Sequence, residues 1–195
     1  MAGGWIRAGR PAASTLAELR RLAEAGALSY RHVGSTLDPA AWPDRKMYEE
    51  TVLLGAGDAV FAAAGDALRS WVCHRGIGAR VFPADAALVE GTTLLVALPI
   101  GPASVVVPNR VVWTVDEADR YGFGYGTIHG HQETGEEAFL AHRSEDGTVR
   151  ATIRVDARTV TVAANALRPA VRAFQKAALR RYLRAWQADV ASRVR

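Results

Sequence analysis

The feature that most limits the possible folds is a change of hydrophobic period close to residue 79. Before this point, from Gly57 to about His74, apolar residues recur with the spacing of one buried helix face. From residue 79 to residue 156 the period becomes two, in short stretches separated by turn-forming residues. A last helical stretch then closes the chain. The pattern predicts a run of antiparallel strands between helices.

The expected elements can be placed by residue number. Thr15 and Glu18 have the spacing of a capping box, so a first helix is expected from about Ser14 to Gly26. A first strand is expected at 48–54, and Pro108 should place its own strand at an edge or a bulge. The further strands are expected at 79–83, 92–98, 104–115, 122–128, 136–143 and 148–156, and the last helix at about 167–191.

This order of elements resembles the helix-grip architecture of the steroid-transfer (START) and birch-pollen-allergen superfamily. The fold class is therefore expected to be α+β, with a curved antiparallel sheet of about six to seven strands wrapped around the long C-terminal helix and an extra N-terminal helix. The resemblance implies an internal cavity for an apolar or mixed ligand. A closed lipocalin-like barrel is the competing layout, and the long amphipathic last helix argues against it.

Composition indicates one globular domain. The 195 residues are 49% hydrophobic, enough to bury a sizeable core in a single domain at 14–192. Residues 1–13 are rich in Gly, Ala and Pro and are expected to form a mobile leader. The single cysteine, Cys73, cannot form an internal disulfide, and no apolar run approaches the length of a membrane span. A cytoplasmic protein is expected.

The net charge of +4 is concentrated in the last helix. Residues 168–195 contain eight basic residues and one acidic residue, Asp189, which leaves the rest of the chain net acidic. Arg172, Lys176, Arg180 and Arg184 form one helical stripe that is either a solvated face or a docking surface for an acidic partner protein. Nucleic acid is not expected as a partner, because no nucleic-acid-binding motif accompanies the stripe.

The segment from Tyr121 to Phe139 carries the mixture of residues most typical of a site. It combines aromatic residues, glycines, two histidines and three glutamates. Tyr125 and Thr127 lie on the aromatic face of their strand, and Gly122, Gly124 and Gly126 leave the other face bare for a close approach. The glycines are not a dinucleotide fingerprint, because no helix is expected to follow them.

Part of this segment, Tyr-Gly-Thr-Ile-His-Gly-His followed by Gly-Glu-Glu, resembles the signature of the domain of unknown function family 1990, also called uncharacterised protein family 0548. Other motifs of that family fit in the same order, from Tyr30 and 33–36 to Tyr182. His129 and Gln132 stand where the family usually has proline. The resemblance covers about 30–186 and implies no reaction.

Strand alternation gives the two adjacent glutamates different roles. The apolar side of the last strand carries Val149, Ala151 and Ile153. With a four-residue loop at 144–147, Glu136 and His142 would project to this apolar side, and Glu137 would form an exterior ion pair with Arg154. A three-residue or five-residue loop would reverse the assignment. An inward carboxyl should have a raised pKa, which suits a general acid or base. A backbone-capping role for Glu136 at Gly130 or Gly135 is the alternative.

Glu136 and His131 are therefore the predicted catalytic residues, although His131 could instead stabilise a turn. The predicted ligand-binding residues are Tyr125, Thr127, His129, His142 and Arg110. A metal site at His129 and His131 is not favoured, because no second cluster completes a ligand set. No cofactor is implied. Cys73-His74 is interpreted as a buried thiol beside a surface imidazole.

The leading hypothesis is a pocket for an apolar, lipid-like or polyketide-like molecule, with or without acid/base chemistry such as cyclisation, dehydration or hydrolysis. Whether the protein is an enzyme stays open. A non-catalytic carrier or sensor and an interaction module for an acidic partner are the alternatives.

Overall fold

The structure is a computed structural model and describes residues 5–45, 47–159 and 168–195. The helices are α1 (Ala13–Glu24), the short 3-10 helix η1 (Pro39–Ala41), α2 (Asp58–Arg69), α3 (Val72–Gly76) and α5 (Arg168–Arg193). The strands are β1 (Trp5–Ala8), β2 (Tyr48–Ala56), β3 (Arg80–Phe82), β4 (Thr93–Ile100), β5 (Ala103–Asp116), β6 (Arg120–Thr127), β7 (Glu133–Arg143) and β8 (Thr148–Thr159).

The strands form one antiparallel sheet in the order β2-β8-β7-β6-β5-β4-β3, with β1 paired to β5 beside this path. The order ends at β2 and β3, so the described strands make an open sheet and not a closed barrel. A curved antiparallel sheet with a long C-terminal helix was expected from the sequence and is confirmed, with eight strands where six to seven were expected.

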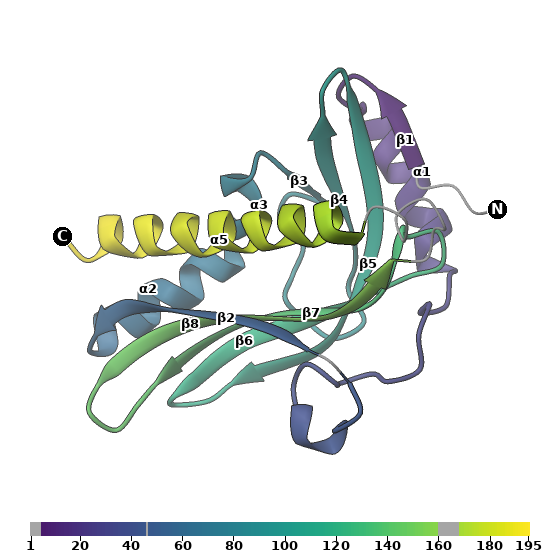
Figure 1. Cartoon of the computed structure of the whole chain (residues 1–195). Coiled ribbons are helices and arrows are strands. Elements are labelled where there is room, and N and C mark those ends of the chain that lie inside the picture. Colours follow the sequence, from purple (N-terminus) through teal and green to yellow (C-terminus); the bar gives the residue numbers. More distant parts are fainter. Residues whose placement is uncertain (1–4, 46, 160–167) are drawn as a thin grey trace.

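Helices α2, α3 and α5 cover one face of the sheet, here called the helix face (Figure 1). This face carries the apolar residues of alternating strand positions, such as Phe123, Phe139 and Ile153, and they form the main core with the helices. The helical spacing predicts an apolar stripe on α5 at Val171, Phe174, Ala178, Tyr182 and Trp186. Tyr182 and Trp186 lie in the core as expected, together with Leu183, whereas Ala178 is only partly buried. The side chains of Val171 and Phe174, expected in the same stripe, lie outside the described residues.

The opposite face of the sheet, here called the outer face, is covered by the N-terminal part of the chain. Helix α1 packs Leu16 and Leu19 against β4 and β5, and the segment 27–45 runs across β6, β7 and β8 (Figure 1). This cover buries polar residues that would otherwise face water. Two layers therefore flank the sheet, and each could hold a site.

Two segments differ from the expected elements. Trp5–Ala8, for which no strand was expected, form β1 and pair with Ala103–Val106 of β5. The expected helix at 57–74 is broken at Trp71, whose φ of 55° is left-handed, and α3 starts there in a new direction. A helix cannot continue through a left-handed residue, and hydrophobic spacing does not report this break.

Pro108 lies inside β5 and not in an edge strand. It follows the stretch that pairs with β1, which ends at Val106, and precedes the stretch that pairs with β6, which begins at Asn109. At this junction a residue without an N–H is tolerated.

Candidate functional site

The register of β7 and β8 decides which glutamate faces which layer. Arg143 pairs with Val149, so five residues separate the pair, and Glu137 lies opposite Val155. Residues 144–147 do separate the two strands, but the expected pairing of Arg143 with Thr148 was wrong, because Ser144 N donates to the carbonyl oxygen of Thr148 and shifts the register by one residue. Since strand faces alternate, one extra residue reverses the assignment. Glu137 lies on the helix face, and Glu136 and His142 lie on the outer face.

On the helix face, Glu137 ends a chain of three polar side chains. Its Oε2 accepts a hydrogen bond from the Tyr125 hydroxyl, whose oxygen lies 3.0 Å from Nε2 of His74. The three residues come from β7, β6 and α3, so the fold brings together positions far apart in the sequence. Because Tyr125 has one proton and gives it to Glu137, the network assigns the proton of a neutral His74 to Nε2.

Aromatic rings surround this chain. The imidazole of His74 lies 5.0 to 5.2 Å, between ring centroids, from Trp71, Phe139 and Tyr182. His74 is 1% exposed, so the expected surface imidazole was wrong, whereas the expected burial of Cys73 is confirmed. Burial lowers the pKa of His74 to about 3. His74 is therefore a neutral hydrogen-bonding group at physiological pH.

Glu137 has the electrostatics of a proton carrier. Burial raises its pKa to about 7, the hydrogen bond from Tyr125 opposes this rise, and the charge of Glu133 adds to it. The side chain is only partly buried, and within the described part of the chain it makes one hydrogen bond, the one from Tyr125. Among those residues, its second oxygen has no hydrogen-bond donor. A carboxyl that titrates near neutral pH can both accept and release a proton.

The neighbouring groups stay protonated. Burial, and next the charge of Glu137, raises the pKa of Tyr125 well above its ordinary value and also raises that of the Cys73 thiol. Tyr125 is therefore a proton donor, and Cys73 is not a thiolate nucleophile. The acid/base capacity of the helix face is concentrated in Glu137.

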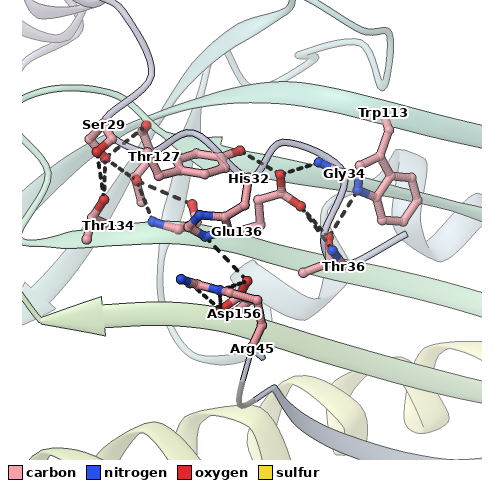
Figure 2. Close-up of polar contacts among 12 residues, drawn as sticks. Ser29, His32, Gly34, Thr36, Arg45, Trp113, Thr127, Thr134, Glu136 and Asp156 are labelled. Atoms are coloured by element: carbon pink, nitrogen blue, oxygen red, sulfur yellow. Dashed lines mark hydrogen bonds and ion pairs between the residues drawn. The ribbon is translucent and has the colours of Figure 1, made fainter. Parts of the chain in front are cut away.

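On the outer face, Glu136 is an anchor for the segment 27–45. Its Oε1 accepts hydrogen bonds from the Tyr30 hydroxyl at 2.8 Å and from Gly34 N at 2.6 Å, and its Oε2 accepts from Thr36 N and Oγ1 (Figure 2). Only 1% of Glu136 is exposed. Four donors occupy both oxygens, so Glu136 caps backbone amides, although not those of Gly130 or Gly135. A ligand could bind it only by displacing a donor.

A second buried carboxylate lies next to this anchor. Asp156 is 2% exposed and receives a double hydrogen bond from the Arg45 guanidinium, at 2.6 to 3.0 Å (Figure 2). Burial opposes its ionisation, but the hydrogen bonds and charge of Arg45 outweigh burial, so the pKa of Asp156 is below its ordinary value. His32 Nε2 lies 3.3 Å from the same carboxylate. The segment 27–45 is thus held to the sheet by two buried carboxylates. Glu136 accepts hydrogen bonds from its first part, and Asp156 forms an ion pair with Arg45 at its end.

The other predicted site residues do not join Glu137. His131 lies in the turn between β6 and β7, where Nδ1 accepts a hydrogen bond from Glu133 N at 2.8 Å and burial lowers the pKa to about 4. Thr127 Oγ1 lies 2.6 Å from Ser29 Oγ and accepts from Gly135 N (Figure 2). Both residues stabilise the turn and the adjoining strand ends. For His131 this is the alternative role, turn stabilisation, that the sequence left open.

The three remaining ligand-binding candidates lie away from the helix face. His129 and His142 are exposed, and His142 borders a surface depression of about 870 Å³ at the loop between β7 and β8. The guanidinium of Arg110 donates to the carbonyls of Ala23 and Glu24 at the end of α1. Arg110 is therefore a helix C-terminal cap in this structure. Within 5–45, 47–159 and 168–195, no three metal-ligating side chains gather into a group.

Sequence reasoning missed the roles of His74 and Glu137. In the helix expected at 57–74, His74 follows the apolar Trp71 by three residues and would share its face, which was a usable signal of burial. Glu137 was assigned to the wrong face of the sheet, because the expected register at the loop between β7 and β8 was off by one residue. Nothing in the sequence indicates that His74 meets Tyr125, because that contact depends on how α3 packs on the sheet.

Comparisons with known proteins agree with this fold. The family model DUF1990, described as a domain of unknown function, matches residues 29–185. A UPF0548 protein from Deinococcus radiodurans is 32% identical over 169 residues, which cover 80% of this chain and 84% of that protein.

Solved structures share the fold at low sequence identity. A hypothetical protein from Helicobacter pylori has a TM-score of 0.57 at 13% identity, covering 83% of this chain and 95% of that one. The ZhuI aromatase/cyclase from Streptomyces sp. R1128 has a TM-score of 0.50 at 13% identity, covering 77% of this chain and 96% of that one. The helix-grip architecture of this chain is thus also found in proteins whose sequences are only distantly similar to it.

Proposed function

The chain belongs to the DUF1990 family, also called UPF0548, and from its helix-grip fold and the site around Glu137 we propose that it binds a small molecule on the helix face. In this proposal Glu137 exchanges a proton with the bound molecule. Tyr125 donates to the carboxylate, and His74 fixes the orientation of Tyr125. The substrate is apolar, since the residues around Glu137 are mostly aromatic and aliphatic.

The observation that carries the proposal is the contrast between Glu137 and its surroundings. A carboxyl with a pKa of about 7 and one hydrogen bond lies among residues that offer little other polarity. A carboxyl at this position does not stabilise the fold, because burial opposes its ionisation. The ZhuI neighbour is an aromatase/cyclase by name, which supports proton-transfer chemistry such as cyclisation or dehydration on this fold.

The hydrogen-bond chain can support either protonation state of Glu137. When Glu137 is ionised, Tyr125 donates to it and the Nε2 proton of His74 points at Tyr125. When Glu137 is protonated, its O–H can donate to Tyr125, and Tyr125 can then donate to the other tautomer of His74. The hydroxyl of Tyr125 can thus stay paired with the Glu137 carboxyl in either of its protonation states.

Native mass spectrometry of the protein isolated from its host tests this proposal. We expect the wild-type protein and a Glu145→Gln control, changed at an exposed loop carboxyl, to retain the same organic molecule. Glu137→Gln should retain less of it or a chemically different species, since the proton carrier is gone. If all three proteins retain the same molecule at the same occupancy, ligand binding would stand but Glu137 would not act as an acid or base. That outcome would favour a carrier or sensor.

A docking role for α5 is a second candidate, favoured by one observation. Lys176, Arg180 and Arg184 are exposed and lie one helical turn apart, and among the carboxylates of the described residues only Glu50 lies near this stripe, 3.9 Å from Arg180. Arg172, expected in the same stripe, has a side chain outside the described residues. An acidic protein partner would complement this stripe. We expect charge reversal at Arg180 and Arg184 to abolish binding of an acidic carrier protein in a titration, and unchanged binding would remove the candidate.

A further inference from the structure

Asn109 is a buried polar residue without an evident structural task. It is 1% exposed, and its Oδ1 has no donor within the described part of the chain. Its Nδ2 makes one long hydrogen bond, 3.4 Å to the carbonyl oxygen of Val107 in the same strand. A buried acceptor without a donor destabilises a fold. A residue of this kind at a core position calls for a partner beyond the described residues, and a bound molecule would supply one.

The face on which Asn109 lies follows from strand alternation. Val107 and Val111, two positions before and after it in β5, belong to the core of the helix face, and so does Leu94, its partner in β4. Arg110, the next residue, points to the outer face and caps α1. Asn109 thus shares the helix face with Tyr125 and Glu137.

The distance between Asn109 and Glu137 matches a small molecule. Val111, Tyr125 and Glu137 form one row across β5, β6 and β7, and Asn109 is paired with Thr127 in the next row. Two strand spacings across and two residues along correspond to about 12 Å between the Cα atoms of Asn109 and Glu137. This separation is about the length of a molecule of two or three fused rings.

We propose that Asn109 recognises a hydrogen-bond donor, a hydroxyl or N–H group, at the end of an apolar ligand that is remote from Glu137. The inference rests on the proposed function, because it takes the helix face to be the binding face. An amide oxygen accepts such a proton without a counter-charge, and so it suits an uncharged ligand. The ligand class is then a mainly apolar ring compound with a hydroxyl at one end.

Equilibrium binding of two probes tests the inference. 2-Naphthol has the donor, whereas 2-methoxynaphthalene has nearly the same shape and lacks it, and both are uncharged at neutral pH. We expect wild-type protein to bind 2-naphthol about 10-fold more tightly or better, the effect of one additional hydrogen bond. The side-chain amide signals of Asn109 should shift in NMR spectra on addition of 2-naphthol only.

Asn109→Leu, which keeps the branched shape and removes the acceptor, should bind both probes equally, at the affinity of wild type for 2-methoxynaphthalene. It should also be at least as resistant to unfolding as wild type, since a buried unpaired acceptor is gone. Asn109→Ala, which cannot overpack the site, should lose the preference in the same way. Thr114→Val, an exposed position in the same strand, is the matched control and should keep the preference.

The outcomes separate the inference from the proposed function. A preference for 2-naphthol that survives both Asn109 variants would overturn the role of Asn109 and leave ligand binding intact. Wild-type protein that binds neither probe would overturn both. Loss of the preference in both variants, with retention of 2-methoxynaphthalene, supports the inference.

Discussion

At the scale of single residues, two adjacent glutamates show how strongly surroundings decide the use of a side chain. Glu136 meets four donors from Tyr30, Gly34 and Thr36 and is fully occupied. Glu137 meets one donor, from Tyr125, and lies among aromatic rings. The first is suited to holding chain segments together, and the second is suited to exchanging a proton.

Tyr125→Phe should raise the pKa of Glu137 above its value of about 7. The hydroxyl of Tyr125 donates to the ionised carboxylate and so favours ionisation, and its removal leaves burial unopposed. NMR titration of the Glu137 side-chain carboxyl carbon measures the shift directly. The control is Tyr182→Phe, because Tyr182 also lies among these rings but its hydroxyl makes no hydrogen bond to Glu137. A Glu137 midpoint that falls, or that moves equally in both variants, would contradict the assigned hydrogen bond.

At the scale of elements, β7 connects the two layers of the molecule. Its outer face holds the segment 27–45 through Glu136, and its helix face presents Glu137 toward α3 and α5. Gly126 in β6 is part of this design, since a Cβ there would lie 1.9 Å from the hydroxyl oxygen of Tyr30. Motif residues that are separated by about a hundred positions in the sequence therefore meet on the outer face.

Glu136→Gln should lower the free energy of unfolding by about 3 kcal/mol at neutral pH, since an amide NH₂ would face two of the four donors. Urea denaturation measures this loss, and hydrogen exchange should become faster at the amides of Gly34 and Thr36. The neighbouring Glu137→Gln is the matched control and should cause no such loss. Unchanged exchange at both amides would show that the segment does not depend on Glu136.

The elements were largely predictable, whereas their register was not. Alternation of apolar residues identified β4 to β8, and helical spacing identified α1 and α5, because each signal lies within the element itself. The faces of Glu136 and Glu137 depend on one residue of loop length between Arg143 and Val149, which alternation cannot count. The cover of the outer face by 27–45 was also invisible, since irregular segments have no period.

At the scale of the whole molecule, two buried groups oppose each other in their effect on stability. The pKa of Glu137 is raised from 4.5 to about 7, so its ionisation costs stability as pH rises through that window. The pKa of His74 is lowered from 6.5 to about 3, so its protonation costs stability as pH falls through that window. Between pH 4.5 and 6.5 the changes of these two costs with pH have opposite signs and partly cancel.

Glu137→Gln should uncover the contribution of the histidine. Above pH 7 the variant should be more stable than wild type by about 3 kcal/mol, because the cost of ionising a buried carboxyl is removed. Below pH 4.5 the two proteins should be equally stable, since Glu137 is then protonated in both folded and unfolded chains. Urea denaturation at a series of pH values checks this. A constant difference at every pH would mean that Glu137 does not titrate in this range.

The pairing of β1 with β5 bears on how the protein is handled. Residues 1–12 look dispensable by composition, and an engineered version that starts at α1 would be a natural choice for expression. Such trimming would remove the strand that pairs with Ala103–Val106 and leave backbone hydrogen-bonding groups of β5 open on that side. Unpaired strand edges recruit strands from other molecules. A shortened chain would thus acquire a route to self-association that the full chain closes with its own first strand.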